Sequence, residues 1–140
     1  MSLITIALEK PPNLTTASRY TVFNGFIYLG LGVVLILWPG AIQMLFRERA
    51  FIGDEQGLFR ALGMAVALIG YYLVIGGRAG SRQATAASVI DRLTVVPLVL
   101  LPLAITGVFP HFLIAVVIVD FCLATSTWVL LRAEARPSDV

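Results

Sequence analysis

Four long stretches of apolar residues constrain this chain more than any other feature. Residues 20–38, 61–77 and 93–110 contain no charged side chain, and residues 112–131 contain only one, Asp120. A stretch of about 18 or more such residues can cross the roughly 30 Å hydrocarbon core of a bilayer as a helix. A soluble helical bundle would need a polar stripe along each helix, and none of the four stretches has one. The sequence therefore predicts an all-α integral membrane protein.

The composition agrees with a chain whose main partner is the lipid bilayer. Hydrophobic residues make up 59% of the 140 residues and charged residues 13%, against about 45–50% and about 25% in soluble domains. The formal net charge of +2 is too small to indicate a nucleic-acid partner. A membrane protein partner, or a second copy of this chain, is a further expectation.

The chain divides into two tails and one transmembrane domain. We predict an N-terminal tail over residues 1–18 and a C-terminal tail over residues 133–140. Between them, residues 19–132 form a four-helix bundle with spans at about 19–38, 57–77, 91–108 and 111–132.

Four spans place both ends of this domain on one side of the membrane, and the positive-inside rule selects that side. Seven basic residues lie in the tails, in the second loop or at the inner edges of spans, and three lie at the other side. The seven are Lys10, Arg19, Arg78, Arg82, Arg92, Arg132 and Arg136, and the three are Arg47, Arg49 and Arg60. This excess predicts that both termini are cytoplasmic.

The first loop is expected to contain a short helix that lies in the membrane interface. Ile42, Leu45 and Phe46 would share one face of such a helix, and the charged residues "RER" follow it. Apolar residues on one face next to a charged segment are typical of interfacial helices. An irregular loop that touches the bundle is the alternative.

Prolines and one glycine define the third span and its connection to the fourth. Pro97 and Pro102 lie inside the span, and each removes a backbone donor, so the helix should bend. Gly107 can end this helix and Pro110 can begin the next, which predicts a tight hairpin.

Asp120 is the polar group whose position most needs an explanation. It lies about ten residues into the fourth span, which at 1.5 Å per residue is roughly 15 Å deep. Charged groups at this depth are costly and usually face the interior of a bundle. The carboxyl group is therefore either neutral or paired. Its candidate partners are Arg60, Arg92 and Asn24, and we favour Arg60.

Small residues at regular spacing support an interior position for Arg60. Arg60, Gly63, Ala67 and Gly70 follow a 3-4-3 spacing, so they lie on one face of the second span. Small residues on one face let membrane helices approach closely, and Gly25 and Gly32 of the first span are the expected counterpart. Tyr71 lies close to the same face and could line a cavity. The polar cluster is either a ligand site or a structural lock, and both interpretations stay open.

The sequence contains no motif that indicates catalysis, a metal or a cofactor. His111 is the only histidine and Cys122 the only cysteine, so neither a histidine pair nor a cysteine cluster can form. A nucleophile elbow and a phosphate-binding loop are also absent. We predict no catalytic residue, no metal site and no cofactor.

The first two spans resemble a known family. "YLGLGVVLILWPGAIQMLF" ends a first span at Pro-Gly before an apolar loop, and "FRALGMAVALIGYYLVIGGR" opens a second span with an arginine and spaced glycines. This arrangement resembles the small four-helix bacterial membrane proteins of the DoxX-like group, over roughly half the chain. The resemblance implies a four-helix bundle in the bacterial inner membrane. It also implies a link, known for some members, to quinone-associated oxidoreductase complexes.

Three functions are compatible with these features, and we favour the first. The first is a non-catalytic accessory protein or subunit that binds a membrane partner or a lipid. The second is a small transporter that uses Asp120 as an intramembrane ion-binding or proton-binding group. The third is a membrane component of a quinone-linked oxidoreductase.

Overall fold

The computed structural model describes residues 13–135. These form four long helices and one short one: α2 (Thr16–Leu37), α3 (Ala41–Phe46), α4 (Glu55–Arg78), α5 (Arg82–Ile105) and α6 (Pro110–Ala135). Each long helix is long and apolar enough to cross a membrane. The predicted all-α fold with four spans and a short helix after the first is confirmed. Much of the two predicted tails, residues 1–12 and 136–140, lies outside the described residues.

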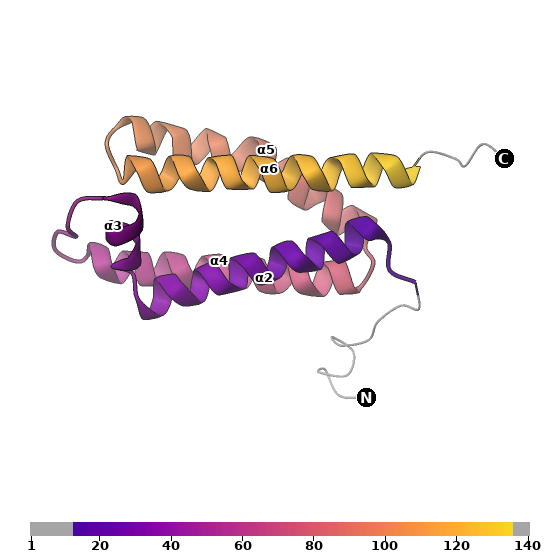
Figure 1. Cartoon of the computed structure of the whole chain (residues 1–140), viewed down its shortest axis with the longest axis horizontal. Helices are drawn as coiled ribbons and strands as arrows, with labels where there is room; N and C mark the ends of the chain where they lie inside the picture. Colours follow the sequence, from indigo (N-terminus) through magenta and orange to yellow (C-terminus); the bar gives the residue numbers. More distant parts are fainter. Residues whose placement is uncertain (1–12, 136–140) are drawn as a thin grey trace.

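The four long helices are arranged as two pairs. α2 packs against α4 and α5 packs against α6, with far sparser contact between the pairs. Figure 1 shows the first residues of α2 and the last of α6 at one end of the molecule, together with the α4–α5 turn. We call this the termini end. α3 and the α5–α6 turn lie at the opposite end, which we call the loop end.

Small residues bring the backbones of α2 and α4 into direct contact. A Cβ atom added to Gly32 would lie 2.6 Å from the Gly63 carbonyl oxygen and 2.7 Å from the Ala67 Cβ. A Cβ atom added to Gly70 would lie 2.7 Å from the Gly25 carbonyl oxygen. No side chain fits at such distances, so the approach depends on glycine. We call this contact the glycine seam. It consists of Gly25 and Gly32 on α2 and of Gly63, Ala67 and Gly70 on α4, which the sequence spacing placed on facing sides of the two spans.

α5 begins nine residues earlier than the sequence predicted. The Ser81 hydroxyl accepts a hydrogen bond from the Ala84 N–H at 3.2 Å, which caps the first turn of the helix. The helix therefore starts at Arg82, and Arg92 lies ten residues inside it. The segment before Arg92 continues the helix instead of forming a loop.

The turn between α5 and α6 is short, as predicted. α5 runs through Pro97 and Pro102 to Ile105, Gly107 has a φ of 86°, and α6 begins at Pro110. A positive φ costs glycine little because it has no Cβ. The turn therefore reverses the chain and sets α6 beside α5.

Aromatic side chains close the loop end of the molecule. Phe59 lies in the middle of this group, with its ring centre 4.7 Å from that of Phe109 and 5.1 Å from that of Phe51. The Arg49 guanidinium lies 4.6 Å from the centre of the Phe109 ring and forms an ion pair of 2.6 Å with Glu55. That hydrogen-bonded pairing raises the pKa of Arg49.

Two carboxylates join the helix pairs at both ends. At the loop end, Glu48 accepts a hydrogen bond of 2.9 Å from the Phe112 N–H in the first turn of α6. At the termini end, Glu134 accepts one of 2.7 Å from the Ala17 N–H in the first turn of α2. Helix N-termini favour negative charge, because their first N–H groups have no partner within the helix. We call these two contacts the end clips.

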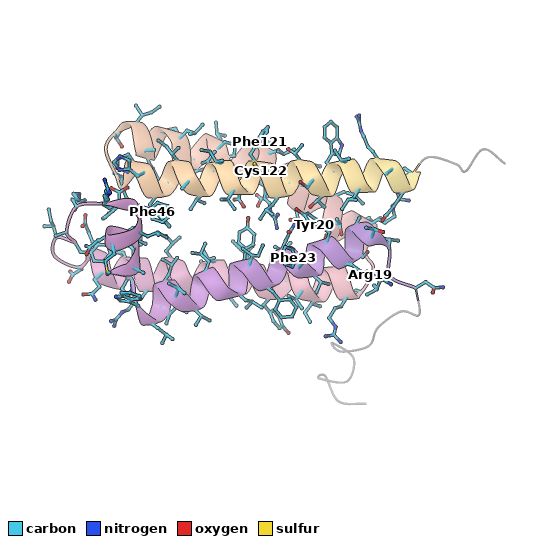
Figure 2. All side chains as sticks on the ribbon, in the orientation of Figure 1. Arg19, Tyr20, Phe23, Phe46, Phe121 and Cys122 are labelled. Carbon is cyan, nitrogen blue, oxygen red and sulfur yellow. The ribbon has the colours of Figure 1, made fainter. Side chains whose placement is uncertain are left out.

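The outer faces of the helices carry large apolar side chains. Phe23 and Phe121 are both exposed and project from the outer faces of α2 and α6 (Figure 2). In a bilayer, such faces contact lipid, because lipid chains are as apolar as the side chains themselves. The chain is a small integral membrane protein with four spans.

Candidate functional site

A cavity lies between the two helix pairs. It has two lobes, of about 180 Å³ and about 280 Å³. Both lobes are lined by Tyr28, Leu31, Phe112, Val116 and Asp120, so they lie side by side. Nearly all of its walls are apolar side chains. The space is present because contacts between the two pairs are sparse.

Each lobe opens sideways, between neighbouring helices. The smaller lobe reaches Leu45 of α3 and Val119 of α6, and the larger one reaches Ile69 of α4 and Val99 of α5. All four of these lining residues are exposed at the molecular surface. Val119, Ile69 and Val99 lie within the candidate spans, so in a bilayer these parts of the openings face lipid chains.

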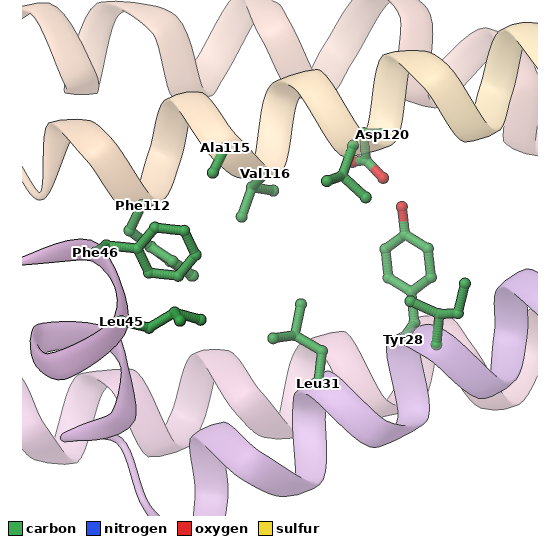
Figure 3. A pocket seen from close by; sticks show the side chains of 10 residues that line it. Tyr28, Leu31, Leu45, Phe46, Phe112, Ala115, Val116 and Asp120 are labelled. Carbon is green, nitrogen blue, oxygen red and sulfur yellow. The ribbon is translucent and has the colours of Figure 1, made fainter.

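Two polar groups face one another where the lobes meet. Asp120 is 5% exposed and Tyr28 is 9% exposed. Figure 3 shows the Tyr28 hydroxyl and the Asp120 carboxyl pointing toward each other across the cavity. The Tyr28 Oη atom is buried without a hydrogen-bond partner. A buried hydroxyl without a partner costs about 1–3 kcal/mol, so this position favours the entry of a molecule that can bond to it.

Arg92 packs behind Tyr28. It is 5% exposed, and its guanidinium carbon lies 4.7 Å from the centre of the Tyr28 ring. A cation over an aromatic face is attracted by the negative charge density of the ring. Among residues 13–135 no ion pair joins Arg92 to Asp120. The Arg92 guanidinium contacts the Tyr28 ring instead of the Asp120 carboxylate that was considered as its partner.

Arg60 does not reach Asp120. Arg60 is exposed on α4, and within the described part of the chain neither an ion pair nor a hydrogen bond connects it to Asp120. The reason is the rotation of α4, whose buried face meets α2 through Gly63 and Gly70. The favoured Arg60–Asp120 pair is therefore not formed. Tyr71 is 48% exposed and does not line either lobe.

Asn24 joins α2 to α6 on the termini side of Asp120. Its Nδ2 donates a hydrogen bond of 3.3 Å to Thr127 Oγ1, and that hydroxyl donates one of 2.8 Å to the Leu123 carbonyl of its own helix. The sequence analysis did not place Asn24 beside Thr127. Asn24 Oδ1 has no partner in the described structure.

Tyr28 is the site residue that sequence reasoning missed. Its signal was available, because Tyr28 follows Asn24 by four residues and so lies on the same helical face. Glu48 and Glu134 were also missed, since an acidic residue outside a span gives no indication of which helix it will cap.

Comparison of the chain with protein-family models, with curated proteins and with solved structures finds no match.

The described residues also offer no cluster suited to a metal ion. Across residues 13–135, no three His, Cys, Asp or Glu side chains lie close enough together to hold one. His111 lies at the loop end, where its Nδ1 atom is 3.5 Å from Glu48 Oε1. The chemistry of this site therefore rests on Asp120, Tyr28 and the apolar walls around them.

Proposed function

We propose that this protein binds a lipid-soluble molecule in the cavity between its helix pairs. The supporting observation is a cavity with apolar walls, open sideways within the spans, whose polar groups are Asp120 and the unpartnered Tyr28 hydroxyl. In this role the protein is a membrane accessory protein or subunit and not an enzyme.

The walls restrict the class of ligand. A phospholipid headgroup carries several charged and polar groups, and burying them against apolar side chains would be costly. Tyr28 and Asp120 together suit one hydroxyl, carbonyl or amine group. The ligand we propose is therefore a molecule with an apolar chain and a single hydrogen-bonding group, such as a long-chain alcohol.

Photo-crosslinking tests this assignment. The full chain in phospholipid vesicles is irradiated with a long-chain alcohol that carries a diazirine on its chain, and crosslinked peptides are identified by mass spectrometry. We expect adducts at Leu31 and Val116, and competition by the unmodified alcohol but not by the alkane of equal length.

Two matched tyrosine variants make the test specific. Tyr28→Phe removes only the cavity hydroxyl and should reduce crosslinking at Val116 severalfold. Tyr72→Phe removes a hydroxyl from an exposed side chain and should change nothing. Adducts spread evenly over the outer faces, or equal crosslinking in both variants, would contradict a specific site.

Two alternatives concern the same site. Transport with Asp120 as the ion-binding or proton-binding group is the second candidate, and it is favoured by the lack of a cationic partner for Asp120 among residues 13–135. A role in a quinone-linked oxidoreductase rests on the resemblance of the first two spans to the DoxX-like group. A quinone differs from the proposed ligand class because it carries two carbonyl groups on its ring. Competition by a quinone in the crosslinking assay therefore tests this alternative.

We also propose that both termini are cytoplasmic, in a bacterial inner membrane. Among residues 13–135, and without Arg92, which is buried in α5, four arginines belong to the segments at the termini end and three to those at the loop end. The four are Arg19, Arg78, Arg82 and Arg132. The positive-inside rule still favours the same orientation. A membrane protein partner or a second copy of the chain stays a prediction.

A further inference from the structure

Buried polar side chains gather in one half of the molecule. From the termini end to the level of Asp120, the interior contains polar residues from three helices, each at most 5% exposed: Ser18, Thr21, Asn24, Thr85, Arg92 and Thr127. We call these six residues the polar file. Between Asp120 and the loop end, the buried core is apolar, with Leu35, Phe59 and Phe109 among its members.

The spacing of these residues aligns them along the helix axes. On α2, Ser18, Thr21 and Asn24 are three residues apart and Tyr28 follows four residues later, which keeps them on one face. On α6, Thr127 follows Asp120 by seven residues, or two turns. Each element therefore presents polar groups in succession between the termini end and the cavity.

Contacts between helices connect the file to the cavity. Asn24 bonds to Thr127 across α2 and α6, and Arg92 of α5 lies against the Tyr28 ring. Two acceptor atoms along this line, Asn24 Oδ1 and Tyr28 Oη, are buried without partners. Buried polar atoms in polar surroundings are where internal water binds, because water supplies the missing hydrogen bonds.

We propose that the polar file is a one-sided pathway through which water and protons reach Asp120 from the termini side of the membrane. A hydronium ion on that side gives its proton, through water and hydroxyl groups, to the Asp120 carboxylate. The products are the neutral acid and water, and no electron is transferred. On the loop side of Asp120, the cavity walls and the buried core are apolar, so this side offers water no hydrogen-bonding groups.

The groups around Asp120 fit this assignment. Of the elements packed near α6, α2 contributes Tyr28 and α5 contributes Arg92, which lies behind the Tyr28 ring. α3 and α4 present only apolar side chains to the cavity. The inference goes beyond ligand binding and does not require a ligand to be present.

A hydrophobic carbodiimide tests the sidedness directly. Dicyclohexylcarbodiimide enters the bilayer and modifies protonated carboxyl groups, so the adduct at Asp120 reports its protonation. The full chain is reconstituted in vesicles, its orientation is determined by protease cleavage of a terminal tag, and the pH is changed on one side at a time. The adduct is measured by mass spectrometry.

We expect labelling of Asp120 to increase when the termini side is acidified and not to depend on the pH on the loop side. An ionophore that collapses the gradient should abolish the difference. Labelling that follows the loop side, follows both sides equally or never occurs would overturn the pathway. These results are independent of alcohol crosslinking, which tests the cavity alone.

Adjacent hydroxyl variants on α6 provide a matched comparison. Thr127→Val removes the file hydroxyl with little change in shape, and should slow labelling severalfold at an acidic pH on the termini side. Ser126→Ala removes an exposed hydroxyl that only bonds to the Cys122 carbonyl, and should label as the parent does. Equal rates in both variants would also overturn the proposal, while the sidedness measurement needs no variant and so does not depend on their folding.

Discussion

Asp120 and Tyr28 point toward each other but do not form a hydrogen bond. The free energy of burying these two polar groups in a bilayer therefore depends on what occupies the cavity beside them. Arg92 contributes through the ring of Tyr28 and not through an ion pair. At the scale of single residues, the intramembrane polar groups are thus arranged around an aromatic side chain. This arrangement leaves the carboxyl free to respond to a ligand or to water.

A double-mutant cycle tests the separation of Asp120 from Arg60. Because Arg60 is exposed on α4, the unfolding free energies of Arg60→Ala and Asp120→Leu should add within about 0.3–0.5 kcal/mol, as for distant sites. Unfolding in mixed detergent micelles supplies the measurement.

Asn24 and Thr127 provide the positive control for this cycle. Their hydrogen bond of 3.3 Å predicts a coupling of about 0.6 kcal/mol between Asn24→Ala and Thr127→Val, typical of bonds between membrane helices. A larger coupling between Arg60 and Asp120 would mean that the two side chains pair in the membrane.

At the scale of elements, the glycine seam determines how closely α2 approaches α4. Gly32 faces the α4 backbone, whereas a Cβ atom added to Gly30 would meet nothing within 4 Å. Substitutions at Gly30 and Gly32, which lie about half a turn apart on α2, therefore separate the effect of packing from the effect of helix propensity.

We expect Gly32→Ala to destabilise the protein by about 1–3 kcal/mol, because an overpacked interface must separate. Gly30→Ala should be neutral or stabilising by up to about 1 kcal/mol, since alanine favours helix more than glycine does. Detergent unfolding measures both. Equal losses in the two variants would show that the seam does not require glycine at position 32.

The seam was predictable from the sequence, whereas the site was not. Facing glycines repeat at helical spacing, so Gly63 and Gly70 could be assigned to the same face from local pattern alone. Arg60 precedes Gly63 by only three residues, but three residues turn a helix by 300°, and this offset is enough to bring its side chain out of the interface. The start of α5 at Arg82 was not predicted because the cap at Ser81 was not recognised.

The cavity itself has no sequence signature. Its walls are ordinary apolar residues such as Leu31 and Val116, which could equally well pack against a neighbour or face lipid. Whether they line a space depends on the distance between the two helix pairs, and that distance follows from tertiary contacts at the ends of the bundle. Tyr28 could be placed on the face of Asn24, but not opposite Asp120.

At the scale of the whole molecule, both described ends of the chain lie together at the termini end (Figure 1). Among the described residues outside the buried interior, more arginines lie at this end than at the loop end, which favours cytoplasmic termini. A reporter that is active only in the periplasm should therefore be silent when fused at Val140. The same reporter inserted near Gly53, in the loop between α3 and α4, should be active. The reverse pattern would overturn the cytoplasmic assignment of the termini.

The end clips carry a consequence for biosynthesis. The Glu48–Phe112 bond joins residues 64 positions apart, and the Ala17–Glu134 bond joins residues 117 positions apart. Both bonds need α6, which is made last. During synthesis the Ala17 N–H group in the first turn of α2 therefore has no Glu134 carboxylate to bond to. By contrast, α2 and α4 can already associate, because the contacts between them are complete once residue 77 has been added. The first helix pair must persist in the bilayer on its own contacts until the ribosome has finished α6.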